Sequence, residues 1–228
     1  MEQATIAKIC VDFAMTLLLL FLMAFHITGE NAHMVSGAAM CVLVIVHLIL
    51  NRIWVRTIHK GRYNAVRTFR LVFNILLFLT MSGLVASGIM MSPIRQFFDF
   101  FPLDIARTLH HVLAYWVFIL VSIHIGIYLK KMTGMMRIKS TANTSRKYAK
   151  AVWLSIIVLI TAYGLYAFVN RQIYSYMFFL NQYTFFDYDQ PVYLFYIDYL
   201  AVMGAFIIIA HYSSFFVSKR FSNKANIS

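Results

Sequence analysis

The sequence predicts an all-α fold, a polytopic membrane bundle of six transmembrane helices. Hydrophobic residues make up 61% of the chain and charged residues only 12%, with a mean hydropathy of +0.74, far from the composition of a soluble domain. Six apolar runs of roughly twenty residues are each long enough to cross a bilayer. The net charge of +12 comes from basic stretches between these runs. That pattern is typical of membrane topology and argues against a nucleic-acid partner.

The first three spans are expected at about residues 6–27, 31–55 and 68–91. The first run follows Lys8 and could be read as a signal peptide, but no small-residue cleavage site ends it, so a retained helix is favoured. Asp12 lies near its start. The third span ends in SGLVASG, whose small residues suit the close approach of a neighbouring helix.

The last three spans are expected at about residues 105–129, 151–169 and 194–217. A basic segment separates the fourth span from the fifth, and an aromatic segment precedes the sixth. The connecting segments are each too short for a flavin, nucleotide or iron–sulfur domain, which we therefore do not expect.

The distribution of Lys and Arg predicts the orientation. Six spans place both termini on one side, and seventeen of the twenty basic residues fall on that side. Arg95, Arg107 and Arg171 are the three on the other side. Because Lys and Arg in short loops are retained on the cytoplasmic side, both termini are expected to be cytoplasmic and the protein to be a multi-pass, lipid-contacting protein of the cytoplasmic membrane.

Four histidines repeat one interval in two of these spans. His33 and His47 in the second span, and His110 and His124 in the fourth, are each fourteen residues apart. Fourteen residues are four turns at the coiled-coil period of 3.5, so both imidazoles of a pair leave the same helix face. At 1.5 Å per residue they are separated by roughly 21 Å along the axis.

The predicted topology places these histidines at two matched depths. The second and fourth spans run in the same direction, so His47 and His124 both lie near the cytoplasmic face, whereas His33 and His110 lie near the outer face. Each depth then offers one imidazole from each helix, as six-coordinate bis-histidine haem iron requires. The chain has no CxxCH motif, so we expect two non-covalent haems of the b type. The competing interpretation, four interhelical hydrogen-bonding histidines, is less consistent with the repeated interval.

Other residues qualify this hypothesis. His26, at the end of the first predicted span, competes with His33 as the outer ligand. His111 points about 100° away from His110 and is expected to be a neighbour, and His211 is expected to be structural rather than a quinone or proton contact. Candidate partners for the haem propionates are Asn51, Arg52 and Arg107, although arginines at helix ends also snorkel to the interface without a ligand.

The segments FHITGENAH, HLILNRIW, SGIMMS and ARTLHHVLAYWVFILVSIH resemble the flavinylation-associated cytochrome family. That family is similar to the b-type di-haem subunits of formate dehydrogenases and hydrogenases. The resemblance covers about residues 12–128. It implies a haem-binding bundle that passes electrons from membrane quinol or a cytoplasmic-side donor to an extracytoplasmic flavoprotein. In the dehydrogenase subunits the first span supplies a ligand, which favours His26, while Tyr128 stands where some relatives carry a further histidine.

Together these observations predict a four-helix di-haem membrane core over residues 1–135, and two further transmembrane helices and a cytoplasmic tail over residues 136–228. The expected function is electron transfer between a quinol or cytoplasmic-side donor and an extracytoplasmic acceptor, either alone or as the membrane subunit of an oxidoreductase. The alternative is a histidine-lined metal-ion or proton transporter. Such transporters usually carry several intramembrane carboxylates, whereas Asp12 lies near a span end and the middle spans have none. A purely structural anchor for a redox enzyme is a third possibility.

Overall fold

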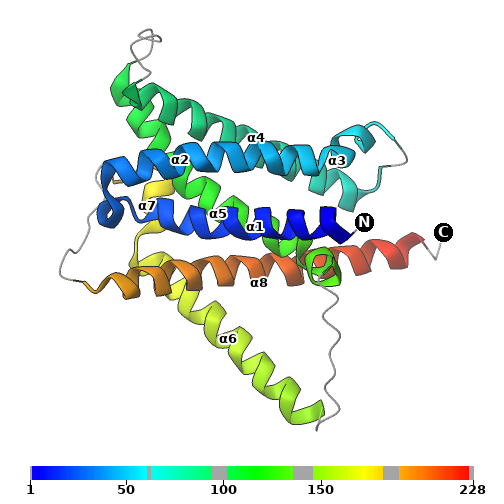
Figure 1. The fold of residues 1–228 in the computed structure, drawn as a ribbon. Helices are drawn as coiled ribbons and strands as arrows, with labels where there is room; N and C mark the ends of the chain where they lie inside the picture. The colour runs from blue at the N-terminus through cyan, green and yellow to red at the C-terminus, as the bar shows by residue number, and fades with distance from the viewer. Residues whose placement is uncertain (1, 61–62, 94–101, 136–145, 182–189, 226–228) are drawn as a thin grey trace. The chain divides into compact units, whose positions relative to one another are not determined.

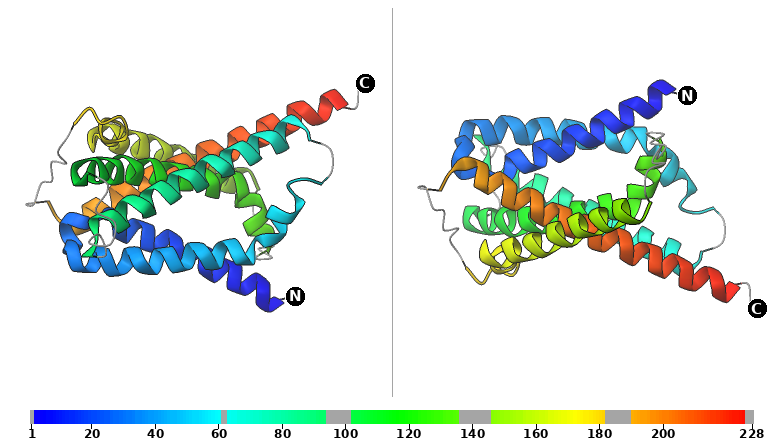
Figure 2. Two further views of the ribbon diagram at one scale, coloured as in Figure 1. Left: turned by 90° about the horizontal axis from the view of Figure 1, so that it is seen from above. Right: turned by 90° about the horizontal axis from the view of Figure 1, so that it is seen from below.

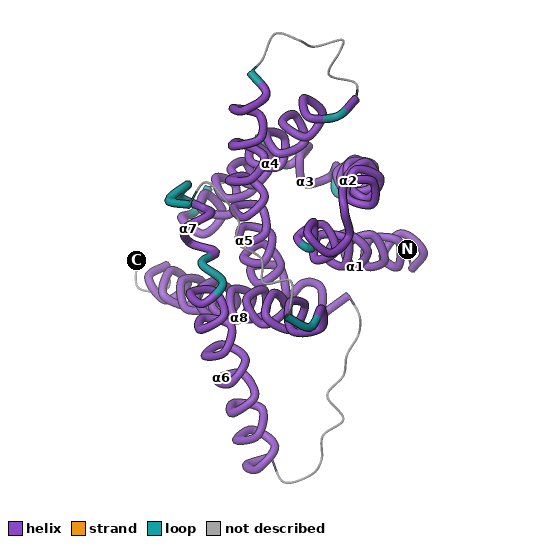
Figure 3. The backbone as a smooth tube through the Cα atoms, turned by 90° about the vertical axis from the view of Figure 1, so that its left-hand side faces the viewer, coloured by secondary structure: helices purple, strands orange, loops and turns teal. Residues whose placement is uncertain are grey.

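The structure, a computed structural model, describes residues 2–60, 63–93, 102–135, 146–181 and 190–225. Regular secondary structure in this part of the chain is entirely helical (Figures 1 and 3). Six of its helices are long and apolar enough to cross a membrane. The predicted fold class, a polytopic helical membrane protein, is therefore confirmed.

The helices follow the predicted order, with two additions. Their bounds are α1 Glu2–Met23, α2 Phe25–Leu50, α3 Arg52–Thr57, α4 Ala65–Met91, α5 Leu103–Met135, α6 Arg146–Asn170, α7 Ile173–Met177 and α8 Val192–Ala225. The short helices α3 and α7 were not predicted. At six and five residues, they are too short to show a helical hydrophobic period.

The chain divides into two compact units. The first comprises residues 1–118 and 175–192, and the second comprises residues 119–174 and 193–228. The division falls inside α5, whose first half belongs to the first unit. The predicted boundary between residues 135 and 136 adjoins the segment 136–145, which lies outside the described residues, so that division remains a prediction.

In the first unit, α1 and α2 lie side by side as a helical hairpin (Figure 2). The turn is at Ala24, which is fully buried. The sequence-based boundary was wrong here: α1 ends at Met23, so His26 is the second residue of α2 and not the end of the first span. Gly29 interrupts the first turns of α2 with φ 76° and ψ 171°, a conformation that is essentially restricted to glycine.

Also in the first unit, α4 approaches the first half of α5 through its glycines. A Cβ atom added at Gly83 would lie 3.0 Å from Cδ1 of Leu113, and one added at Gly88 would lie 3.2 Å from Cε1 of His110. The SGLVASG segment therefore lies against a neighbouring helix, as predicted. On α5, Trp116 donates a hydrogen bond of 2.9 Å from Nε1 to the carbonyl oxygen of Met177 and so holds α7 in place.

In the second unit, α8 packs against α6 and the second half of α5. An added Cβ at Gly164 would collide with the backbone of Ala201, and one at Gly126 with the backbone of Ile207. By contrast, α6 leaves many large apolar side chains exposed, including Trp153 and Leu159 at 66% and 67%. Such side chains are suited to lipid rather than water.

Candidate functional site

His33 of α2 and His110 of α5 are brought together in the first unit. Their ring centroids are 6.1 Å apart, and their ring planes make an angle of 76°. An imidazole nitrogen binds a metal at about 2 Å, so two imidazoles on opposite sides of one metal have centroids roughly 6 Å apart. The observed separation therefore fits the distance that a shared iron requires.

The partners of His110 determine which of its ring nitrogens carries the proton. Nδ1 lies 3.2 Å from the carbonyl oxygen of Leu84 and 3.2 Å from Oγ of Ser87. A carbonyl oxygen can only accept a hydrogen bond, so Nδ1 is the protonated nitrogen and Nε2 keeps its lone pair. Ser87, which is 3% exposed, itself donates to Leu84 at 2.9 Å. Leu84 and Ser87 of α4 therefore fix the tautomer of His110 that can bind a metal through Nε2.

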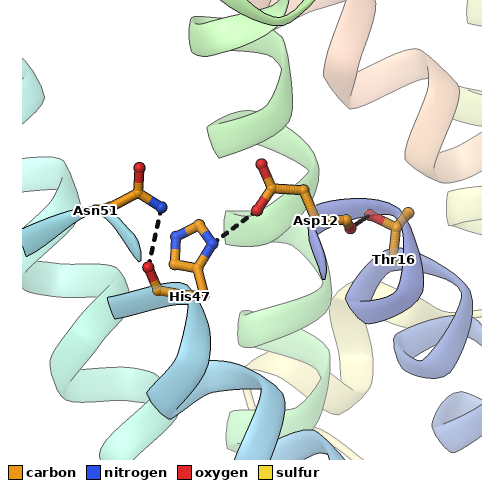
Figure 4. A network of polar contacts seen from close by, with 4 residues as sticks. All are labelled: Asp12, Thr16, His47 and Asn51. Atoms are coloured by element: carbon orange, nitrogen blue, oxygen red, sulfur yellow. Dashed lines mark hydrogen bonds and ion pairs between the residues drawn. The ribbon is translucent and has the colours of Figure 1, made fainter. Parts of the chain in front are cut away.

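His47 is held in the same tautomer by a different partner (Figure 4). Its Nδ1 lies 2.7 Å from Oδ1 of Asp12, across the α1–α2 hairpin. A carboxylate accepts, so a proton is on Nδ1, and the neutral form of the ring has its lone pair on Nε2. The side chains of His47 and Asp12 are 27% and 24% exposed. Hydrogen bonding of one ring nitrogen to a carboxylate is the usual arrangement for a histidine that binds metal through the other nitrogen.

The backbone around this pair is also held by hydrogen bonds. Asn51 ends α2 and donates from Nδ2 to the carbonyl oxygen of His47 at 3.0 Å. Thr16 donates from Oγ1 to the carbonyl oxygen of Asp12 at 2.8 Å. Figure 4 shows Asn51 beside His47 on α2 and Thr16 beside Asp12 on α1.

The second predicted pair, His47 and His124, is divided between the two units. His47 belongs to the first unit and His124 to the second, so this pairing remains a prediction. Within its own unit, His124 lies one turn before Tyr128, with ring centroids 4.8 Å apart. Tyr128 thus packs against a predicted ligand.

The remaining candidates are placed as follows. His26 is half-buried in the first turn of α2, while the ring found beside His110 is that of His33. Arg107, one turn before His110, and Arg52, the first residue of α3, are both exposed. Asn51 uses one amide hydrogen as a helix cap and retains a second. The proposed contacts of these residues with a cofactor remain predictions.

His111 and His211 lie beside tyrosines. The ring of His111 is 5.2 Å from that of Tyr115 and 5.4 Å from that of Tyr176, and the two tyrosines stack at 5.0 Å. His111 thus faces an aromatic cluster, in keeping with its predicted role as a neighbour. His211 is half-buried, with its ring 5.5 Å from that of Tyr212.

Sequence reasoning did not include Asp12 among the site residues. A carboxylate in a membrane span is costly unless it is paired, and Asp12 and His47 both lie toward the predicted cytoplasmic ends of adjacent spans. That combination could have suggested the pair. The role of Leu84 could not have been found, because a backbone carbonyl leaves no signature in the sequence.

A second polar group in the second unit was also missed. The carboxylate of Asp198, which is 8% exposed, accepts from Arg171 Nε at 2.8 Å and from the Tyr163 hydroxyl at 2.5 Å. Nη2 of Arg171 is 2.7 Å from the same carboxylate. The charge of Asp198 is therefore fully compensated, and the group joins α6 to α8.

The described residues contain no cluster of three or more His, Cys, Asp or Glu side chains that could hold a metal ion. A haem with two histidine ligands needs no such cluster, because the porphyrin supplies the other four iron ligands. Comparisons with protein-family models, curated proteins and solved structures found no match to this chain.

Proposed function

We propose that this protein is a membrane-embedded b-type di-haem cytochrome that belongs to the flavinylation-associated cytochromes. In this proposal it passes electrons across the cytoplasmic membrane between a quinol or cytoplasmic-side donor and an extracytoplasmic flavoprotein. The observation that carries the proposal is the pair of imidazoles of His33 and His110, 6.1 Å apart between centroids.

The outer site is supported by distance, tautomer and packing together. The tautomer of His110 leaves a lone pair on Nε2. The distance between the ring centroids of His33 and His110 suits one metal between the two rings. Gly88 allows α4 to lie against the His110 ring, because any side chain there would crowd Cε1. Haem, when bound, would supply one-electron redox chemistry, while His33 and His110 would hold it and the chain would provide burial and orientation.

The inner site is supported by the repeated interval and by the state of His47. The contact of Asp12 with Nδ1–H of His47 selects the neutral tautomer whose Nε2 could bind a metal. On α2 it lies fourteen residues from His33, so the two sites are separated by roughly 21 Å along the axis. The hydrocarbon core is about 30 Å thick. Two cofactors at this spacing therefore cover most of the distance that an electron has to cross.

The partners follow from the orientation and from the family resemblance. Arg52 and Arg107 are exposed cations near the inner and outer sites, where they can pair with haem propionates. The segments between the helices are too short for a flavin domain, and in this proposal the flavin is carried by a separate extracytoplasmic protein. A membrane quinone is the second candidate partner.

The test is the haem content of the purified protein. We expect two b-type haems per chain, measured by the pyridine haemochrome method, and a low-spin bis-histidine signal in electron paramagnetic resonance. A protein made with adequate haem supply that shows no b-type spectrum would overturn the proposal. Metal-dependent ion flux by such a haem-free protein would favour the transporter instead.

Single alanine variants assign the ligands. We expect His33→Ala and His110→Ala each to lose one haem and keep the other, and His47→Ala and His124→Ala to lose the second haem. His26→Ala should keep both, because the ring beside His110 is that of His33. His59→Ala is the matched control, since His59 is exposed in the segment after α3.

A further inference from the structure

We infer that Asp12 is a positioning residue that makes the haem on His47 the lower-potential haem of the two. This inference rests on the proposed function. Its basis is a difference between the two histidines: Nδ1 of His47 bonds to a carboxylate, whereas Nδ1 of His110 bonds to a backbone carbonyl and a serine hydroxyl.

The geometry of the pair suits this role. The Asp12–His47 distance of 2.7 Å is that of a charge-assisted hydrogen bond. Because the two residues come from different helices, the bond fixes the His47 ring relative to α1 as well as α2. The Asn51 cap holds the backbone of His47 from the other side. The ring is thereby held with Nε2 available to a metal.

The charge of Asp12 has an electronic consequence for the ligand. A carboxylate that accepts the Nδ1–H increases the electron donation of the imidazole to a metal at Nε2. Ferric iron carries one more positive charge than ferrous iron, so this donation stabilises the ferric state more and lowers the potential. The neutral partners of His110 have a weaker effect. Each tenfold change in the preference for one oxidation state corresponds to about 59 mV for a one-electron couple.

The difference in reduction potential between the two haems would give the proposed conduit a direction. A lower potential at the His47 end and a higher one at the His110 end favour electron movement from the first to the second. In the predicted orientation this movement is outward, toward the extracytoplasmic acceptor. Asp12 therefore provides a direction that the two histidine pairs by themselves do not.

A purely structural role for Asp12 makes a different prediction. If the carboxylate only joins α1 to α2, its replacement lowers stability but leaves the potential of any retained haem unchanged. Asp12→Asn separates the two roles, because the amide oxygen can still accept from His47 Nδ1 while the negative charge is lost. Asp12→Ala removes both the bond and the charge.

The experiment is a redox titration of the full-length protein in detergent, followed optically and combined with haem quantitation. In Asp12→Asn we expect the reduction potential of the haem on His47 to rise by at least about 59 mV, which is a tenfold change in its equilibrium constant for reduction. The potential of the other haem should stay unchanged. In Asp12→Ala we expect retention of the His47 haem to weaken by roughly 10–100-fold. His47→Ala identifies which wave belongs to which haem.

Thr80→Val is the matched control. Thr80 lies on α4 and donates within its own helix, to the carbonyl oxygen of Leu76. Its replacement should leave both potentials and both haems as in the wild type.

Two outcomes separate failure of this inference from failure of the proposed function. Two haems in the wild type and unchanged potentials in Asp12→Asn would overturn the role of Asp12 and leave the cytochrome intact. A wild-type protein without haem would overturn both. If Asp12→Asn does not accumulate, the potential of the His47 haem that Asp12→Ala retains is measured instead. It should rise while that of the other haem stays the same, and an unchanged potential overturns the inference.

Discussion

In His110 and in His47, the ring nitrogen that carries the proton determines which nitrogen could bind a metal. In each ring, Nδ1 faces an oxygen that accepts a hydrogen bond. In the neutral ring the lone pair is then on Nε2. The partners come from different helices, α4 for His110 and α1 for His47. The two tautomers are thus selected by two independent routes.

Some contacts of the candidate site could be predicted from the sequence and others could not. The fourteen-residue interval and the topology predicted that His33 and His110 share a depth, and their rings do lie side by side. The Asp12–His47 contact depends on how α1 is rotated about its axis. The block TLLLLFLMAF is apolar on all sides, so its sequence gives no preferred face from which to read that rotation.

Gly29 leads to a prediction at the same scale. Its φ of 76° and ψ of 171° lie in a region that costs other residues roughly 1–3 kcal/mol. We expect Gly29→Ala to lower the stability by about that amount, because a Cβ disfavours the backbone bend between His26 and His33. Thermal unfolding in detergent, followed by circular dichroism, measures it. Gly37→Ala is the control, since Gly37 has open space around it, and equal stability loss in both variants would contradict the explanation.

At the scale of helices, the apolar runs predicted the number and order of the spans but not all of their ends. The first span was expected to reach residue 27, yet the chain turns at Ala24. The segment AFHIT carries no proline or glycine to mark the turn. What defines the turn is burial of Ala24 inside the hairpin, a tertiary effect that a local pattern does not contain.

The glycines of the second unit lead to a prediction about helix contacts. In an exposed helix, Gly→Ala stabilises by about 1 kcal/mol. We expect Gly164→Ala and Gly126→Ala to do the opposite, because the added methyl group would collide with the backbone of α8 at Ala201 and Ile207. Thermal unfolding of each variant, compared with Gly37→Ala, measures the difference. Stabilisation by all three substitutions would show that α8 does not approach these glycines.

At the scale of the whole molecule, function depends on which end of the bundle faces the cytoplasm. Composition identified the membrane protein, and the helices confirm it. The orientation is predicted by charge alone, because a helix bundle presents the same packing to the bilayer either way up. The proposed outward electron flow requires the Asp12–His47 end to be cytoplasmic.

Cysteine labelling of intact cells tests this orientation. In a background in which the two free cysteines, Cys10 and Cys41, are replaced by serine, Thr57→Cys and Asp104→Cys place single exposed thiols at opposite predicted faces. A membrane-impermeant maleimide should label Asp104→Cys in intact cells and Thr57→Cys only after permeabilisation, because the side with seventeen of the twenty basic residues is predicted to be cytoplasmic. The reverse labelling would place the His47 end outside. The potential difference set by Asp12 would then favour electron flow into the cell, and the flavoprotein acceptor would have to be replaced by a donor.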